Sequence, residues 1–221
     1  NDGNIWVFPL IYGGWRTGEY PSNWLGPQIR KDWLDRLGLE IPTTIDEWYN
    51  VLKAFKEEDA NGNGDPNDEI PLIATGFTSG AMGLQNWATA WGVLKGFYND
   101  NGVVKFGAIE DAFKDYLTTM AAWYKEGLID PDCPATDSKN FDAKVTIGQA
   151  GAFITGDTRW ATYTNAASDI AGFKLVGAPW PKGPAGQAYT SNTDVKRAGG
   201  SYGIVITTKN QHPVESVKWL D

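Results

Sequence analysis

The sequence predicts an α/β fold, because segments typical of strands alternate along the chain with segments typical of helices. Short apolar runs bounded by turn-forming residues, such as residues 5–11 and 150–155, are typical of buried strands. Between such runs, apolar residues recur at three- and four-residue spacing, which places them on one face of a helix. The chain shows no internal repeat, so these elements are expected to build an α/β architecture rather than a solenoid.

The first third of the chain predicts a strand, a loop and two helices. After the strand at residues 5–11, residues 12–27 form a loop rich in glycine and aromatic residues. Apolar residues from Ile29 to Leu37 then follow helical spacing, and Gly38 ends that helix. Thr44 and Glu47 have the spacing of a capping box at the start of the second helix.

The middle of the chain predicts a short extended segment at residues 70–72, a short helix at residues 81–91 and a hairpin at residues 98–104 that turns at Asn101-Gly102. The most regular helical spacing follows, and Gly127 ends it. Its apolar face comprises Phe113, Tyr116, Leu117, Met120, Trp123 and Tyr124.

The last third predicts a helix at residues 141–149, a strand at residues 150–155 and a helix that Asp157 caps. Two further strands, at residues 173–178 and 202–207, are separated by the Pro/Gly-rich stretch 179–200. A final helix opens at Pro213, and the chain stops inside it at Asp221, so we expect a fragment of a longer protein.

Composition restricts the class of protein. The 221 residues are 42% apolar, which is enough for one substantial core or two smaller ones. The net charge of −8 argues against nucleic acid, since a phosphate-binding protein needs a basic face. No run of about 18 apolar residues is present to cross a membrane.

Three stretches carry ordered combinations of charged, aromatic and small residues. They are Gln28-Ile29-Arg30-Lys31-Asp32-Trp33-Leu34-Asp35-Arg36-Leu37-Gly38-Leu39 with Pro42-Thr43-Thr44-Ile45-Asp46-Glu47, then Gly148-Gln149-Ala150-Gly151-Ala152-Phe153-Ile154-Thr155-Gly156-Asp157-Thr158-Arg159-Trp160, and Gly203-Ile204-Val205-Ile206 with His212-Pro213-Val214-Glu215-Ser216-Val217-Lys218-Trp219-Leu220. Together they resemble the family 1 extracellular solute-binding proteins, the capture components of ABC importers. The departures are mild: Gln28 stands where a tyrosine is usual, and Gly151-Ala152-Phe153 replaces the more common Ala-Met.

The resemblance implies a type II periplasmic-binding-protein-like fold, in which two α/β lobes joined by crossover strands close on a ligand. By the family's order, we expect residues 1–12 to form the crossover strand into the second lobe, residues 13–200 to form that lobe, and residues 201–221 to return to the first lobe. It also implies an extracellular protein, either periplasmic or anchored as a lipoprotein, that passes a carbohydrate, in particular an oligosaccharide, to ABC permease subunits in the membrane.

The loop after the second helix has oxygen-bearing side chains spaced as at the start of a calcium-binding loop. With Asp59 as the first position, Asn61, Asn63 and Asp65 occupy the third, fifth and seventh. The pattern departs from an EF-hand at its end, where the acids come early, at Asp68 and Glu69.

Two interpretations of this loop are open: a calcium site, or a set of Asx turns with solvated charges. We predict a structural calcium ion, which the resemblance favours because alginate-binding members of the family carry a similar loop after this helix. The predicted ligands are Asp59, Asn61, Asn63, a backbone carbonyl near Asp65, Asp68 and Glu69.

Sugar recognition needs aromatic faces and planar hydrogen-bonding groups. The candidate ligand-binding residues are Trp15, Trp24, Trp87, Arg159 and Trp160. In maltose-type relatives aromatic residues of two of these segments stack on sugar, and the resemblance carries that role over to Trp87 and Trp160 only, which we expect to be partly exposed on one concave surface. The alternative for each tryptophan is a place in the core.

No sequence pattern supports catalysis. The only histidine, His212, directly precedes a proline at a helix start, and the only cysteine, Cys133, lies near two acids that disfavour its thiolate. Phosphate loops, dinucleotide fingerprints and nucleophile elbows are absent from the sequence. We therefore predict a binding protein and not an enzyme. A saccharide hydrolase with a carboxylate pair remains the alternative, and a cell-wall adhesion module is a third interpretation.

Overall fold

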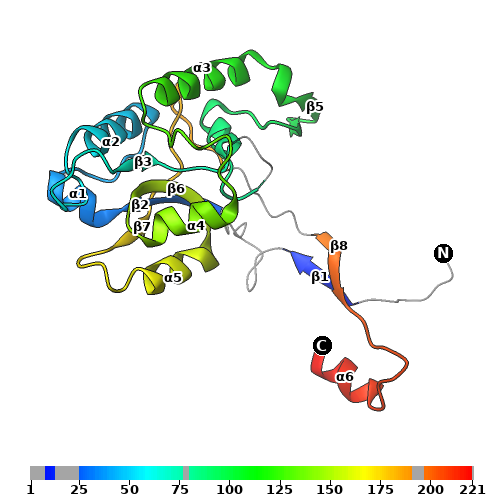
Figure 1. The fold of residues 1–221 in the computed structure, drawn as a ribbon. Helices are drawn as coiled ribbons and strands as arrows, with labels where there is room; N and C mark the ends of the chain where they lie inside the picture. Colours follow the sequence, from blue (N-terminus) through cyan, green and yellow to red (C-terminus); the bar gives the residue numbers. More distant parts are fainter. Residues whose placement is uncertain (1–7, 13–24, 77–79, 191–196, 221) are drawn as a thin grey trace. The chain divides into compact units, whose positions relative to one another are not determined.

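The computed structural model describes residues 8–12, 25–76, 80–190 and 197–220, and the chain divides into two compact units. Unit 1 comprises residues 1–23 and 193–221, and unit 2 comprises residues 24–192 (Figure 1). In the described part of the chain, no helix combines the length and the apolar character needed to span a bilayer.

A four-stranded mixed sheet forms the centre of unit 2 (Figure 1). Its strands are β2 (Leu25–Arg30), β3 (Ile70–Leu72), β6 (Ala150–Gly156) and β7 (Leu175–Gly177), in the order β3-β6-β2-β7. β2 runs antiparallel to β6 and β7, whereas β3 runs parallel to β6. The predicted alternation of strands and helices is therefore confirmed.

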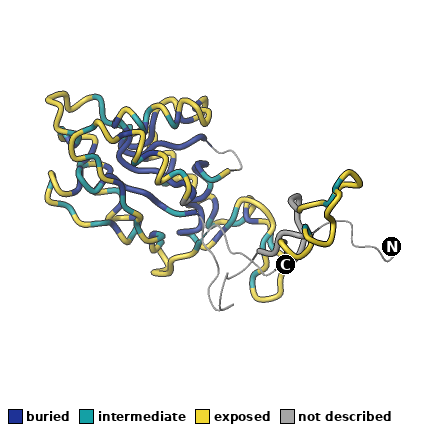
Figure 2. The backbone as a smooth tube through the Cα atoms, turned by 90° about the horizontal axis from the view of Figure 1, so that it is seen from below, coloured by how far each residue is buried: buried dark blue, intermediate teal, exposed yellow. Residues whose placement is uncertain are grey.

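Helices cover both faces of this sheet, so unit 2 has three layers and a core on each side. α2 (Ile45–Glu57) and α3 (Asp111–Lys125) contribute to the larger core, together with Ala152 and Ile154 of β6. α4 (Ser138–Thr146) and α5 (Asp157–Ala166) contribute to the smaller one, which includes Phe153. From Ala152 to Ile154, successive residues of β6 thus serve opposite cores, because successive side chains of a strand point to opposite faces of the sheet. Figure 2 shows this buried centre surrounded by exposed chain.

The boundaries of the first two helices follow local signals with one correction, whereas the helix predicted at residues 141–149 lies three residues earlier, as α4. Ile29 was expected in the first helix, but it is a fully buried residue of β2, and α1 (Lys31–Leu37) starts only after that strand. Gly38 ends α1 with a φ of 66°, as predicted. Thr44 Oγ1 accepts a hydrogen bond from the Glu47 N–H, and Glu47 Oε2 accepts one from the Thr44 N–H, which confirms the capping box.

Several residues of the first sequence motif have structural roles. Arg30 is buried, and its guanidinium lies 4.9 Å from the centroid of the Trp33 ring and 4.3 Å from that of Phe173. It binds both carboxylate oxygens of Asp32 and donates to the Gly148 carbonyl at 2.8 Å. A buried charge needs such partners, so this arginine ties α1 to the chain that precedes β6.

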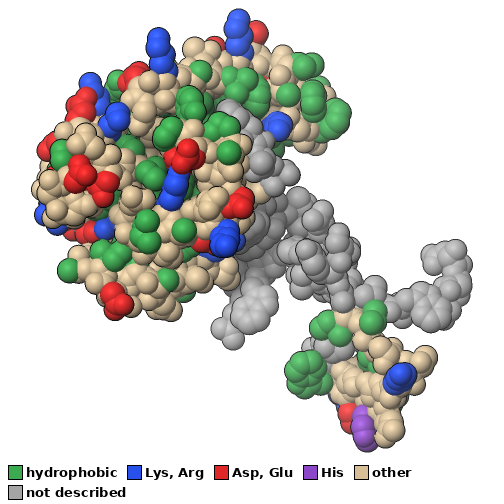
Figure 3. Space-filling view, viewed as in Figure 1, with side chains coloured by type: hydrophobic (Ala, Val, Ile, Leu, Met, Phe, Trp, Pro, Cys, Tyr) green, Lys and Arg blue, Asp and Glu red, His purple; other side chains and the backbone are tan. Residues whose placement is uncertain are grey.

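The hairpin was predicted correctly. β4 (Phe97–Asp100) and β5 (Val103–Phe106) pair antiparallel, and Asn101 and Gly102 both have positive φ. It follows the 3₁₀ helix η1 (Leu84–Trp91) and precedes the short 3₁₀ turn η2 (Gly107–Ile109). Large apolar side chains gather on its surface (Figure 3). They are Phe97, Val103, Val104 and Phe106.

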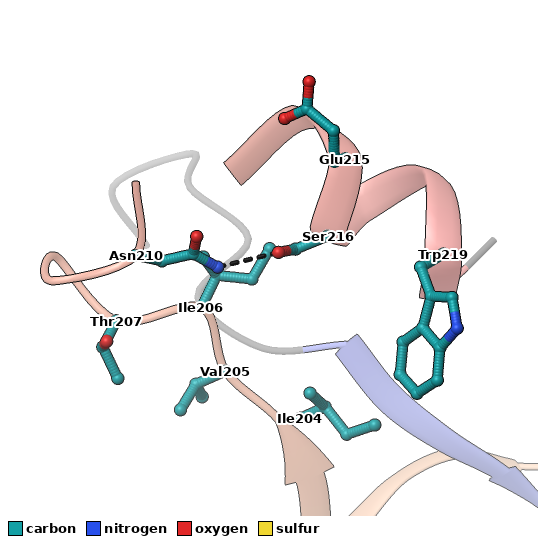
Figure 4. A pocket seen from close by; sticks show the side chains of 8 residues that line it. All are labelled: Ile204, Val205, Ile206, Thr207, Asn210, Glu215, Ser216 and Trp219. Atoms are coloured by element: carbon teal, nitrogen blue, oxygen red, sulfur yellow. Dashed lines mark hydrogen bonds between the residues drawn. The ribbon is translucent and has the colours of Figure 1, made fainter. Parts of the chain in front are cut away.

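Unit 1 pairs strands from the two ends of the chain. β1 (Phe8–Tyr12) runs antiparallel to β8 (Arg197–Ile204), and α6 (Pro213–Leu220) follows. β8 begins earlier than the predicted strand, because Arg197 and Ala198 already pair with β1. The segment after β8 and α6 line a cavity of about 560 Å³ (Figure 4). Its walls include Val205, Ile206 and Trp219.

Candidate functional site

α5 carries the candidate aromatic residue that is exposed. It begins directly after β6, and its N-cap is Gly156, one residue before the predicted Asp157. Trp160 is 41% exposed, and its Nε1–H donates to the Leu175 carbonyl of β7 at 3.2 Å. The indole is therefore held at its polar edge while part of its apolar surface faces solvent, which fits the predicted partial exposure. An aromatic ring in this state can stack on the apolar face of a sugar.

Arg159, the neighbouring candidate, binds other protein groups. Its Nη1 forms an ion pair with Asp142 of α4 and donates to the Tyr163 hydroxyl at 3.0 Å. Tyr163 in turn donates to the same Asp142 Oδ1 at 2.6 Å. Sequence reasoning missed Asp142 and Tyr163, although the four-residue spacing of Arg159 and Tyr163 indicates that they share a helix face.

The prediction that Trp87 is partly exposed is wrong. Only 1% of Trp87 is accessible, because η1 turns it into the larger core of unit 2. Its ring lies 4.9 Å from that of Trp48 and 6.3 Å from that of Trp123, both in edge-to-face arrangement. Trp87 and Trp160 therefore do not share an exposed surface. Trp15 and Trp24, the remaining candidates, lie outside the described residues.

The acidic loop is organised by its own side chains. Both carboxylate oxygens of Asp59 accept backbone N–H groups, from Gly62 and Asn63 on Oδ1 and from Gly64 on Oδ2, at 2.8–3.0 Å. The side-chain oxygens of Asn61 and Asn63 accept the N–H two residues further on, which are Asx turns. Acceptor groups at alternate positions are thus bound to the backbone within the loop.

The second half of the loop brings carboxylates towards these amides. Asn61 Nδ2 and Asn63 Nδ2 each donate to Asp68, at 2.8 Å. Glu69 Oε1 accepts the Asn61 N–H at 3.3 Å, whereas its Oε2 is buried without a hydrogen-bond partner. Burial raises the pKa of Glu69, and the neighbouring charges of Asp68 and Asp59 act in the same direction. Asp65 is exposed and accepts from Asn67 at 3.1 Å.

The oxygen-bearing side chains of this loop suit a hard cation, which prefers carboxylate, amide and carbonyl oxygens as ligands. The partnerless Glu69 Oε2 is an acceptor that such an ion would satisfy. Among the described residues, however, no three side chains of His, Cys, Asp or Glu converge closely enough to hold a metal ion. A cation would therefore require the carboxylates of Asp59, Asp68 and Glu69 to move together.

A second concave surface, beside α3, is apolar. It encloses about 560 Å³ and is lined by Gly76, Leu84, Leu117, Met120, Ala121, Tyr124, Cys133 and Pro134. Leu117 and Tyr124 were expected in the buried face of α3, but they are 38% and 44% exposed because they border this groove. Cys133 is buried, which raises the pKa of its thiol and agrees with the expected lack of reactivity.

Comparison with known proteins adds the following findings. A sequence profile of bacterial extracellular solute-binding proteins matches residues 6–221. FusA of Streptococcus pneumoniae serotype 4, a fructooligosaccharide ABC transporter substrate-binding protein, is 32% identical over 229 residues, which cover all of this chain and 40% of FusA. The lipoprotein LipO of Bacillus subtilis strain 168 is 36% identical over 156 residues, which cover 67% of this chain and 30% of LipO.

Solved structures show the same similarity. The alginate-binding protein AlgQ2, described without calcium ion, is 31% identical with a TM-score of 0.71 over 99% of this chain and 43% of AlgQ2. FusA in complex with kestose is 29% identical with a TM-score of 0.73, over 99% of this chain and 43% of FusA. An EF-hand mutant of FusA also matches, with a TM-score of 0.67 and 28% identity. The chain spans less than half the length of these relatives.

Proposed function

Because the chain belongs to the bacterial extracellular solute-binding protein family, we propose that the protein is the solute-binding component of an ABC importer and that its ligand is an oligosaccharide. The observation that carries this proposal is the similarity, over the whole chain, to a fructooligosaccharide-binding transporter protein. The fold class predicted from the sequence, an α/β fold of the periplasmic-binding-protein type, is confirmed by the solved relatives.

We assign unit 2 to the second lobe of the protein. Its extent, residues 24–192, falls within the lobe expected at residues 13–200. Unit 1 joins residues from both ends of the chain through the β1–β8 pair, which suits segments that cross between lobes, expected at residues 1–12 and 201–221. Two lobes that close on a ligand would bury most of its surface, as small-molecule sites do.

For the ligand surface of this lobe we propose Trp160 as the sugar-stacking residue, supported by its exposed ring and anchored indole nitrogen. Trp15 and Trp24 remain proposed contacts from the loop that precedes β2. Trp87 is withdrawn from the set because it lies in the core. Arg159 stays in the proposed site as the neighbour of Trp160 on α5, and its guanidinium is bound to Asp142 and Tyr163.

We propose that the acidic loop binds a structural calcium ion through Asp59, Asn61, Asn63, Asp68, Glu69 and a backbone carbonyl near Asp65. The buried, partnerless Glu69 Oε2 supports this, and so do two relatives: AlgQ2, whose structure was solved without calcium ion, and FusA, which was also solved as an EF-hand mutant. When bound, calcium would neutralise the carboxylates and crosslink the loop. Asn61 and Asn63 would turn their amide oxygens inward and give up their bonds to Asp68.

We propose that the protein acts outside the cytoplasm, as a periplasmic protein or lipoprotein, and does not catalyse a reaction. The family is one of extracellular solute-binding proteins, and the proteins similar to this chain include the lipoprotein LipO. Its partners would be the ligand and the membrane-embedded permease subunits of the importer.

Calorimetry of the full-length protein with a panel of oligosaccharides tests the proposed function. The panel comprises kestose, maltotriose, stachyose and alginate oligosaccharides, with a peptide mixture as the control. We expect at least one saccharide to bind with a Kd of about 1 μM, equivalent to about −8 kcal/mol. Binding of peptides only, or release of new reducing ends from a saccharide, would contradict the proposal.

A further inference from the structure

Three side chains connect α4 to α5 in unit 2. Asp142 of α4 accepts hydrogen bonds on Oδ1 from both Arg159 and Tyr163 of α5, and Arg159 also donates to the Tyr163 hydroxyl. Each of the three groups therefore contacts the other two. Because Arg159 and Tyr163 are four residues apart, they project from the same face of α5. We call Asp142, Arg159 and Tyr163 the α4–α5 clamp.

The clamp is anchored in the smaller core. Tyr163 is 1% exposed, and its ring packs at 5.6 Å from that of Phe153 and 6.4 Å from that of Phe141. Burial and the bond to Asp142 raise the pKa of the Tyr163 hydroxyl, so it remains a donor at physiological pH. The bond to Tyr163 likewise raises the pKa of Arg159, which keeps its charge.

α5 depends on such external contacts, because its own sequence stabilises a helix poorly. No side chain caps its N-terminus, since the N-cap is Gly156. Three of its ten residues are threonines and one is an asparagine, which have low helix propensity. A short helix of this kind takes its position from tertiary packing.

α5 has a second attachment, to the sheet, through the side chain of Trp160. Its Nε1–H reaches the Leu175 carbonyl of β7, the edge strand of the sheet, so the indole has no donor left for a ligand. What it can offer is the face of its ring. Useful stacking requires that such a face be held within about 0.5 Å and 10–20° of the productive position.

We propose that Asp142 and Tyr163 are positioning residues of the ligand site: through Arg159 they fix α5 and so orient the Trp160 ring for stacking on a saccharide. This inference rests on the proposed function, in which Trp160 meets the sugar. It assigns Arg159 an internal role, in which the guanidinium crosslinks α5 to α4 instead of contacting the ligand.

The test combines a binding measurement with a local spectroscopic one in the full-length protein. Kestose affinity is measured by calorimetry, and the ¹⁹F resonance of Trp160 is followed in protein labelled with 5-fluorotryptophan, assigned with a Trp160→Phe variant. We expect Asp142→Ala to weaken kestose binding about tenfold, or ~1.4 kcal/mol, and to shift or broaden the Trp160 resonance. Tyr163→Phe, which removes only the hydroxyl, should have the same effects to a smaller degree.

Matched controls exist in the same unit. Tyr49 donates to Glu126 at 2.8 Å, so Tyr49→Phe and Glu126→Ala remove a tyrosine–carboxylate bond that is more exposed than the Tyr163–Asp142 bond and does not involve α5. These variants should leave both the kestose affinity and the Trp160 resonance unchanged. A general loss of stability, in contrast, would move the resonances of many tryptophans together.

Two outcomes overturn the inference. One is a Trp160 resonance that stays in place in Asp142→Ala. The other is Asp142→Ala with undiminished kestose affinity while Arg159→Ala loses affinity, which would show that Arg159 contacts the sugar directly. If the unmodified protein binds no saccharide of the panel, the proposed function fails separately, and the ¹⁹F comparison still decides whether the clamp orients Trp160.

Discussion

Replacing Trp87 and Trp160 by alanine, one at a time, should distinguish a tryptophan of the core from a tryptophan of the surface. Trp87 is 1% exposed and packs against Trp48 and Trp123. A buried aromatic side chain removes roughly 150–250 Å² from water, which at about 25 cal/mol per Å² gives about 4–6 kcal/mol as an upper bound. Measured Trp→Ala changes in cores cost about 3–5 kcal/mol, and we expect that range here.

Trp160→Ala should cost less stability. Trp160 is 41% exposed, and the substitution removes one hydrogen bond, to Leu175, that contributes about 1 kcal/mol. Neighbouring side chains and water can fill the space at the surface, so we expect a total loss of about 1–2 kcal/mol.

The assay is urea unfolding of both variants beside the unmodified chain, with the m-value checked for each. In thermal unfolding, a loss of 3–5 kcal/mol should lower the Tm by about 6–20 °C for a unit of this size. In the full-length protein, only Trp160→Ala should also weaken saccharide binding. The assignment of the two residues is refuted if Trp160→Ala destabilises the chain as much as Trp87→Ala does.

Three further predictions concern the acidic loop and the isolated chain. Excess calcium should raise the Tm and a chelator should lower it, because an ion that binds only the folded state stabilises it by mass action. Asp59→Ala should abolish this response. Identical melting curves in chelator and in calcium would contradict the calcium site. The folded-state pKa of Glu69 is raised by burial, so its stabilising contribution is fully present below its unfolded pKa, about 4.3, and is lost as the pH rises through the folded pKa. In chelator, Glu69→Gln should therefore raise the free energy of unfolding at neutral pH and leave it unchanged near pH 3. Denaturation curves at both pH values measure this, and a Glu69→Gln chain that is less stable than the unmodified chain at neutral pH would contradict the prediction. Residues 1–221 alone should bind saccharides about a thousandfold more weakly than the full-length protein, because only one proposed lobe surrounds the ligand, and calorimetric binding at micromolar Kd would disprove this.

Local sequence signals predicted many helix and strand boundaries. The Thr44–Glu47 capping box, the positive-φ glycines Gly38 and Gly127, and the Asn101-Gly102 turn all lie where the sequence placed them. Each depends on contacts within a few residues, so the sequence alone is sufficient to predict it. The same holds for the spacing of oxygen-bearing side chains in the acidic loop, which folds into consecutive Asx turns.

Tertiary structure decided the rest. Helical periodicity extended to Ile29, but the sheet placed that residue in its interior, between β6 and β7. The sequence supplied eleven tryptophans and could not tell which face of η1 would turn inward, so only packing against Trp48 showed that Trp87 belongs to the core. Asp142 and Leu175, which hold Arg159 and Trp160, are 17 and 15 residues away from them along the chain. Such partners meet only after the helices and strands pack, because the sequence separation between them carries no local periodicity that could reveal the contact.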